Sequence, residues 1–271
     1  MGNDHEGRRV SRRRLLAGVS SIGFGALVTA CAGKGAGPST VTTSTGETVT
    51  LEAVTDADLT ALLSGAQTCT LTASTTQGPY YFDAGKIRSD IREDKPGTKL
   101  RLALQVQDSE TCRPIPNAVV EIWHCDAGGL YSGAEAASGG SGGAPPPPGG
   151  GDGDLVPADD TRYLRGAQVT NQGGIVEFTT IWPGWYRGRT VHIHVMVHVG
   201  AEKTLTTQLM FDEALNARVL ATEPYARHTG RDTFNDDDSI YRPSMLLKVA
   251  QARDGYVGGI VLNADPDHDG A

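Results

Sequence analysis

The chain has 271 residues, a formal net charge of −8 at pH 7 and a hydrophobic share of 38%, which suffices for a packed core but is too low for a protein embedded in a membrane. Residues 1–30 carry five arginines against two acidic residues, a net charge of +3, so the rest of the chain carries −11 and is a poor candidate for binding nucleic acid. The 35 glycines and 14 prolines favour a fold rich in strands and turns.

Residues 1–31 have the pattern of an export signal. The run from Ser11 to Leu16, Ser-Arg-Arg-x-Leu-Leu, resembles a twin-arginine signal, and the apolar segment after it is too short to span a bilayer comfortably. Val28-Thr29-Ala30-Cys31 resembles a bacterial lipobox, in which the cysteine is lipidated. We therefore expect an exported protein, anchored to the membrane only through lipidation at Cys31 or released to the periplasm or medium. An ordinary cleavage site with an incidental cysteine is the alternative.

The composition after the signal changes twice. Residues 32–66 begin with a stretch of Gly, Ser, Thr and Ala that cannot bury enough surface to offset its ordering entropy, which predicts a flexible tether. Within it, Asp56–Gly65 has the pattern of a short helix. Residues 67–271 are expected to form one domain, interrupted by a long exposed Gly/Pro-rich loop at 136–154.

Three cysteines follow Cys31. Cys69 and Cys112 lie near loop-like sequence, and a disulfide between them is possible in an exported protein. Cys125 lies in a strand-like run and is expected to be a buried free thiol.

Alternating apolar residues predict strands through most of the domain, whereas helical periods are few and short. The expected strands are 99–107, 118–123, 168–170, 175–181, 191–199 and 204–211. We therefore predict an all-β fold, an antiparallel β-sandwich with long loops and little helix.

The strand at 191–199 carries the strongest chemical signal. Its valines and Ile193 alternate with His192, His194, Met196 and His198, so His192 and His194 point into one space. Two imidazoles placed in this way are well suited to hold one metal ion. A turn at Pro183-Gly184 delivers Tyr186 and Arg189 just before them.

Several motifs, taken in order, resemble the intradiol ring-cleavage dioxygenase family. The skeleton of the strands and turns looks like a prealbumin-like sandwich, which alone implies no enzyme, so a non-catalytic surface module is one alternative. The ordered set is more specific and covers roughly Thr72 to Phe211. It comprises Gly78-Pro79-Tyr80-Tyr81, Ile122-Trp123-His124-Cys125-Asp126-Ala127 with Tyr131-Ser132, Arg165-Gly166-x-Gln168-x-Thr170, and Pro183-Gly184-Trp185-Tyr186 through His194.

The resemblance implies a non-haem Fe(III) bound by two tyrosinates and two histidines, here Tyr131, Tyr186, His192 and His194. Ferric iron lowers the pKa of a phenol enough to hold it as a phenolate. The resemblance further implies that a catechol-type aromatic diol and O2 yield a cis,cis-muconate-type product, with Tyr186 accepting a substrate proton.

The resemblance also assigns residues to the substrate. Arg189 would stabilise negative charge that develops on the substrate, and Gln208 would line the pocket beside it. Pro79 and Tyr80 match a segment that walls the substrate site. Family members commonly pair subunits, so a homodimer is possible. The short connection from Tyr186 to His192 and the Gly/Pro-rich loop depart from cytosolic relatives and leave the substrate's identity open.

Other conspicuous residues receive structural interpretations. His198 is expected to be structural, His124 to be a packed group behind the ligands, and Asp236-Asp237-Asp238 to be a solvated turn. A third hypothesis remains open, a copper or zinc protein that uses His192, His194 and His198. It needs His198 and neither tyrosine.

Overall fold

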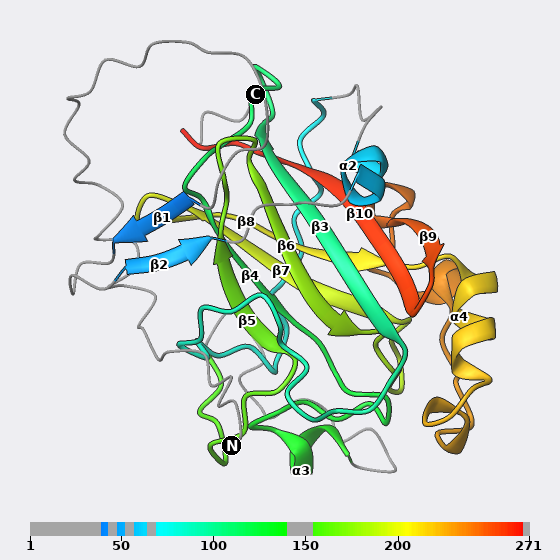
Figure 1. The fold of residues 1–271 in the computed structure, drawn as a ribbon. Coiled ribbons are helices and arrows are strands. Elements are labelled where there is room, and N and C mark those ends of the chain that lie inside the picture. Colours follow the sequence, from blue (N-terminus) through cyan, green and yellow to red (C-terminus); the bar gives the residue numbers. More distant parts are fainter. Residues whose placement is uncertain (1–38, 43–47, 52–56, 64–68, 140–153, 268–271) are drawn as a thin grey trace, which may run out of the picture.

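The computed structural model describes residues 39–42, 48–51, 57–63, 69–139 and 154–267 (Figure 1). The predicted export signal with Cys31 and most of the Gly/Pro-rich loop lie outside these residues. Within the described parts of the chain, no helix is both long enough and apolar enough to cross a membrane.

Two four-stranded sheets pack face to face, as the predicted sandwich requires. The first has the order β6 (Ile175–Ile181), β3 (Lys99–Asp108), β10 (Gly255–Ala264), β9 (Lys248–Ala252). The second has the order β5 (Arg165–Val169), β4 (Val119–Trp123), β7 (His192–Val199), β8 (Glu202–Met210). β10 pairs with β3 in parallel, a departure from the predicted antiparallel architecture, whereas the other neighbours are antiparallel.

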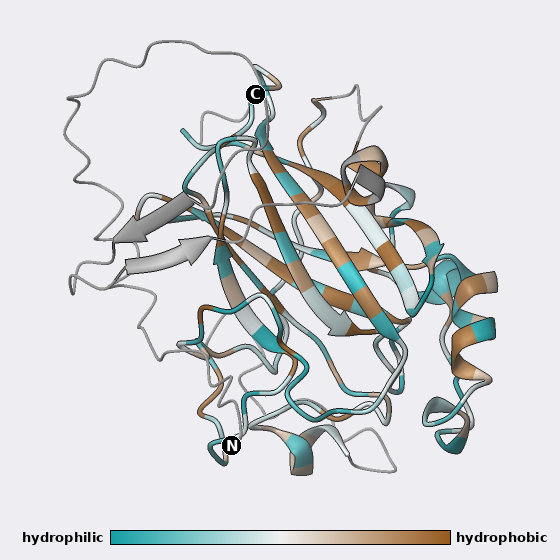
Figure 2. Cartoon of the chain, viewed as in Figure 1, coloured by the Kyte–Doolittle hydropathy of each residue, from teal (hydrophilic) through white to brown (hydrophobic). Residues whose placement is uncertain are grey.

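The main core lies between the sheets and follows from the alternation of the strands (Figure 2). Leu100, Leu102 and Leu104 of β3 meet Ile193 and Val195 of β7, and all five side chains are fully buried. Because successive side chains point to opposite faces of a strand, burying Ile193 and Val195 turns the histidines of β7 to the outer face of their sheet.

The predicted strand positions agree closely with the structure for β3, β4, β6, β7 and β8, and β5 begins three residues earlier than expected. The sequence interpretation missed β9 and β10. It also missed α4 (Glu213–Leu220), whose N-cap Asp212 accepts hydrogen bonds from the backbone of Ala214 and Leu215. The other helical segments are short: α3 (Glu135–Ser138), η1 (Tyr225–Arg227), η2 (Asn235–Asp237) and η3 (Pro243–Met245).

Part of the predicted tether belongs to the folded domain. The expected short helix is α2 (Ala57–Leu63), which packs on the outer face of β10 and β3 and buries Leu59 and Leu63 (Figure 1). The domain therefore begins before residue 67. Further upstream, β1 (Ser39–Thr42) and β2 (Thr48–Leu51) form an antiparallel pair where the sequence predicted irregular chain.

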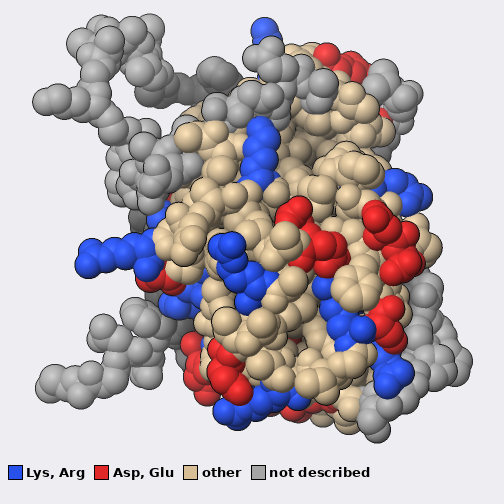
Figure 3. Space-filling model, turned by 90° about the vertical axis from the view of Figure 1, so that its right-hand side faces the viewer, with Lys and Arg blue, Asp and Glu red and all other residues tan. Residues whose placement is uncertain are grey.

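Cys69 and Cys112 form a disulfide in the structure, with Cα atoms 5.3 Å apart. This is the pairing that the sequence made possible without fixing it. Cys125 is a buried free thiol, and burial raises its pKa. On the face shown in Figure 3, the acidic and basic side chains of the described residues are interspersed, so this face carries no extended surface of one sign.

Candidate active site

The candidate site lies on the outer face of the β5-β4-β7-β8 sheet, beneath the loops that follow residue 77 and residue 125. His192 and His194 project from β7 and are each 2% exposed. A second apolar cluster covers them and includes Tyr80, Trp123 and Tyr131. The site is therefore buried between the sheet and its loops.

Two loops that are distant in sequence bring the tyrosines to this face. Tyr131 follows a tight turn in which the Asp126 carboxylate accepts hydrogen bonds from the backbone of Gly128 and Leu130. Tyr186 follows Pro183-Gly184, and the Gly184 N–H donates to the Asp126 carbonyl at 3.1 Å. This contact joins the two loops and so places both phenols over β7.

Only glycine fits at residue 184. A Cβ there would lie 2.4 Å from the Asp126 carbonyl oxygen and 2.7 Å from that of Ala127, and both are backbone atoms. We expect Gly184→Ala to lower the free energy of unfolding by about 1–3 kcal/mol and to weaken metal binding as the loops separate. Urea unfolding and iron titration measure the two effects. Gly128→Ala in the same turn is the control, because its Cβ would lie 3.5 Å from the nearest atom, an Asp126 side-chain oxygen. Equal behaviour of both variants would contradict the role of the contact.

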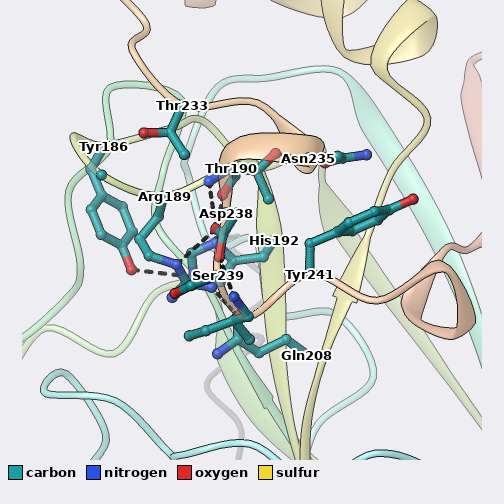
Figure 4. Close-up of polar contacts among 12 residues, drawn as sticks. Tyr186, Arg189, Thr190, His192, Gln208, Thr233, Asn235, Asp238, Ser239 and Tyr241 are labelled. Carbon is teal, nitrogen blue, oxygen red and sulfur yellow. Dashed lines mark hydrogen bonds and ion pairs between the residues drawn. The ribbon is translucent and has the colours of Figure 1, made fainter.

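The donor atoms of the four predicted ligands converge. His192 Nε2 lies 3.1 Å from His194 Nε2 and 3.2 Å from the Tyr186 hydroxyl (Figure 4). The Tyr131 and Tyr186 rings have centroids 5.8 Å apart. Neighbouring ligands of one ion with bonds near 2.1 Å lie about 3.0 Å apart. The spacing of these atoms suits a shared metal ion.

The hydrogen bonds leave lone pairs free in the centre of the site. His192 Nδ1 donates to the Thr190 carbonyl at 2.7 Å, so its Nε2 is the unprotonated nitrogen. The buried Tyr131 hydroxyl and His194 Nδ1 have no hydrogen-bond partner among the described residues. Buried polar atoms without partners are costly unless something else satisfies them. A cation at this point would satisfy the Tyr131 hydroxyl and the facing Nε2 atoms of His192 and His194, whereas His194 Nδ1 lies on the other edge of its ring.

The electrostatics agree with this chemistry. Burial, with the charge of Arg189, lowers the pKa of His192 to about 3, and burial also lowers the pKa of His194 well below its usual value. Burial raises the pKa of Tyr186 to about 12 and that of Tyr131 well above 10. Without a cation the site thus holds two neutral imidazoles and two neutral phenols. Only a strong positive charge would ionise these phenols at neutral pH.

Aromatic side chains and a glycine form the walls. The Trp123 indole stacks on His194 with centroids 4.9 Å apart, because β4 pairs Trp123 with His194 in register. Tyr80 stacks on Tyr131 with centroids 4.7 Å apart. A Cβ at Gly78, where φ is +76°, would lie 3.2 Å from the His194 ring, and Pro79 lies between Gly78 and Tyr80.

The predicted substrate residues Arg189 and Gln208 are in direct contact. Arg189 Nη2 donates to Gln208 Oε1, and Gln208, on β8, is 1% exposed (Figure 4). The Gln208 Nε2 donor is buried without a partner among the described residues. Arg189 Nε donates to Asp238 Oδ2 at 2.9 Å. The site therefore has a guanidinium fixed on one side and an unpaired amide donor beside it.

One expectation about the acidic run is wrong. Asp236 and Asp237 are exposed, as a solvated turn requires, but the Asp238 side chain is only 1% exposed and forms an ion pair with Arg189. Burial acts to raise the pKa of Asp238, yet the charge of Arg189 and the backbone N–H groups lower it below its usual value, so it is ionised at neutral pH. No local pattern distinguishes Asp238 from its neighbours, because its partner is 49 positions away.

Sequence reasoning also gave no role to Arg165. This side chain is 2% exposed, and its guanidinium carbon lies 5.8 Å from the Tyr131 ring centroid. It donates to Ser132 through both Nε and Nη2. Burial lowers its pKa to about 9, so it remains charged at neutral pH beside Tyr131.

The contacts of His198 are separate from those of the four predicted ligands. A register shift between Val197 and His198 ends the regular alternation of β7, and His198 Nε2 contacts Glu121 Oε1 at 2.9 Å. Among the described residues, no group of three or more His, Cys, Asp or Glu side chains is placed to hold a metal ion. The copper or zinc hypothesis that needs His198 therefore gains no support.

His124 is packed, and its Nδ1 donates to the Cys125 carbonyl while its Nε2 accepts from the Thr180 hydroxyl, both at 2.7 Å. Burial lowers its pKa to about 4. The folded state thus favours neutral His124, and this contribution to stability is lost as pH falls from about 6.5 towards 4. Unfolding of metal-free protein by urea at pH 7 and pH 5 is expected to show a smaller loss for His124→Gln than for the wild type. An equal loss in both proteins would contradict this prediction.

Solved structures with the same fold are dioxygenases. An intradiol ring-cleavage dioxygenase from Tetranychus urticae is 32% identical, with a TM-score of 0.66 over 74% of this chain and 96% of that one. The dioxygenase domain of a dioxygenase–carbohydrate-binding protein fusion from Streptomyces sp. SirexAA-E is 26% identical, with a TM-score of 0.51 over 72% of this chain and 98% of that one.

Sequence comparisons agree. A family model described as Dioxygenase matches residues 76–146. Chlorocatechol 1,2-dioxygenase of Rhodococcus opacus is 25% identical over 166 residues, which cover 52% of this chain and 56% of the relative. Catechol 1,2-dioxygenase of Pseudomonas sp. (strain EST1001) is 30% identical over 149 residues, which cover 51% and 46%. The chain thus matches about half the length of these curated relatives.

Proposed function

Because this chain belongs to the intradiol ring-cleavage dioxygenase family, we propose that it inserts both atoms of O2 into a catechol-type aromatic diol to give a cis,cis-muconate-type product. The observation that carries the proposal is the convergence of Tyr131, Tyr186, His192 and His194 at one buried site. One diol and one O2 account for all atoms of the product, so the reaction needs no external reductant.

The four converging side chains would hold a ferric ion. Two phenols and two neutral imidazoles form a set of hard and borderline donors, and the phenolates would favour Fe(III) over Fe(II). When bound, the ion would supply the positive charge that keeps the diol ionised and draws electron density from its ring. The Tyr131 hydroxyl supports this assignment, because it is buried without a partner among the described residues and a cation would satisfy it.

We assign proton transfer to Tyr186. Its side chain is half-buried, whereas Tyr131 is fully buried. It extends from a short turn in which the Arg189 N–H donates to the Tyr186 carbonyl at 3.3 Å. Its hydroxyl oxygen, as phenolate, can accept a proton from the incoming diol.

Arg189 would stabilise negative charge on the substrate. Its planar fork is held by Gln208 and Asp238, and a fixed guanidinium in a water-poor pocket is effective because it needs no reorientation during reaction. The stacked Tyr80 and Tyr131 rings and the Gly78-Pro79 segment would bound the pocket on the side of a flat aromatic substrate.

The proposal is tested with iron-loaded protein, catechol and O2. We expect equimolar consumption of catechol and O2, a muconate absorbance in the ultraviolet, and two labelled oxygens per product molecule when 18O2 is used. Ring opening with one labelled oxygen, or consumption of O2 without ring opening, would contradict an intradiol dioxygenase.

We also propose that the protein is exported and anchored through a lipid on Cys31. The sequence of residues 1–31 supports this, and so does the Cys69–Cys112 disulfide, since such bonds persist in oxidising compartments. Metabolic labelling with a fatty acid should mark the wild type and leave Cys31→Ser unlabelled. Label on both proteins would place the modification elsewhere.

A further inference from the structure

The Arg189 side chain is held at two of its three nitrogens. Nε donates to Asp238 and Nη2 to Gln208, whereas Nη1 makes no hydrogen bond to the described residues. Figure 4 shows the guanidinium between these two partners, close to Tyr186 and His192. Hydrogen bonds on two sides therefore fix the plane of the guanidinium, and Nη1 is left to bind a ligand.

Asp238 is itself fixed. Its Oδ2 accepts from the Thr190 N–H at 2.9 Å in addition to Arg189, and its Oδ1 accepts from the Ile240 N–H at 2.9 Å. Both oxygens thus accept hydrogen bonds, and the carboxylate cannot rotate without breaking one to the backbone. A buried carboxylate in this state is a rigid anchor for the guanidinium.

The segment that carries Asp238 is tied to the strands of the site. Asn235 accepts from the Thr190 hydroxyl at 2.7 Å and donates to the Phe211 carbonyl at 2.9 Å. Arg231 pairs with Glu213 at 2.7 Å, and Glu213 accepts from the Asn235 N–H at 2.9 Å. The segment 231–238 is therefore connected to Thr190, which follows Arg189, and to Phe211 and Glu213, which follow β8.

We propose that Asp238 is a positioning residue, which holds the Arg189 guanidinium in the orientation that the reaction requires. The inference rests on the proposed function, because Arg189 is the group that meets the substrate. A displacement of about 1 Å at a positioned group can cost roughly 100-fold in rate. Asp238 would thus control catalysis without touching the substrate or the metal ligands.

A purely structural role must be distinguished, since Asp238 also accepts two backbone N–H groups. Asp238→Asn keeps the shape and an oxygen acceptor but removes the charge. Asp237→Asn is the matched control, because Asp237 is exposed in the same turn. Combining Asp238→Asn with Arg189→Gln completes a double-mutant cycle.

In the iron-loaded protein, Asp238→Asn is expected to lower kcat about 10- to 100-fold with less than about a threefold change in KM, and to leave the visible iron–tyrosinate band and the iron content unchanged. In the Arg189→Gln background it should lower kcat by less than about twofold, because the group it positions is gone. Asp237→Asn should match the wild type. Equal losses of kcat from Asp238→Asn in both backgrounds would overturn the proposal.

The wild type and the three variants of the double-mutant cycle separate this inference from the proposed function. A wild type that cleaves no aromatic diol contradicts the function. The urea midpoints of the metal-free proteins then still test the anchor: the shift of the double variant should be smaller than the two single shifts together. Additive midpoint shifts would show that Asp238 does not hold Arg189.

Discussion

Replacing Tyr131 with phenylalanine is expected to weaken metal binding strongly and at the same time to stabilise the metal-free protein. The buried hydroxyl has no partner among the described residues, and such a group costs about 1–3 kcal/mol. We therefore expect Tyr131→Phe to raise the free energy of unfolding by about 1 kcal/mol. Loss of the phenolate should weaken ferric iron binding by at least ~100-fold. Mutating residues that only hydrogen-bond to a metal ligand already lowers metal affinity about 10- to 100-fold. Turnover should fall with it by at least about 1,000-fold.

The matched control is Tyr225→Phe. The Tyr225 hydroxyl donates to the Trp182 carbonyl at 2.6 Å and accepts from the Thr98 N–H at 3.0 Å. Its removal should therefore cost stability, about 1–2 kcal/mol, and leave iron binding intact. Urea unfolding and iron titration of both variants give the comparison. If Tyr131→Phe destabilised the protein as Tyr225→Phe does, or bound iron like the wild type, Tyr131 would be an ordinary core residue.

Arg189→Lys should lower kcat about 100-fold while KM changes little. Lysine keeps the positive charge but cannot bond Asp238 and Gln208 simultaneously in the plane of a fork, so the charge is no longer fixed where the substrate becomes negative. Steady-state kinetics with catechol under air measure the effect.

Arg187→Lys serves as the control for Arg189→Lys, because Arg187 is exposed on the same turn. It should retain wild-type kinetics. A kcat for Arg189→Lys within about twofold of the wild type would show that charge alone suffices, and would remove the reason for the fixed guanidinium.

Local patterns predicted the sheet of the site well. Alternation along residues 191–199 identified β7 and put His192 and His194 on one face, because side chains two positions apart in a strand point the same way. Both faces of β7 are buried in the structure. Tyr186 followed from the turn that precedes the strand. Tyr131 was predicted only through the family resemblance, since nothing local links it to β7.

The features that sequence analysis missed depend on long-range pairing. β10 carries Gly258-Gly259 in its middle and pairs in parallel with β3, more than 150 positions earlier, so neither its type nor its partner is encoded locally. Asp238 is one of three consecutive aspartates, and nothing in the local sequence distinguishes it from Asp236 and Asp237. Only the fold brings it to Arg189. The packing of α2 on β10 could not be predicted either, because β10 itself was not predicted.

The most direct test of the ferric site is the visible absorption spectrum of the purified, iron-loaded protein, recorded without oxygen before and after the addition of catechol. We expect a broad tyrosinate-to-iron band that moves to longer wavelength when catechol binds, and a weaker band or none in Tyr131→Phe. A protein that stays colourless after loading with iron would contradict the assignment of Tyr131, Tyr186, His192 and His194 as its ligands.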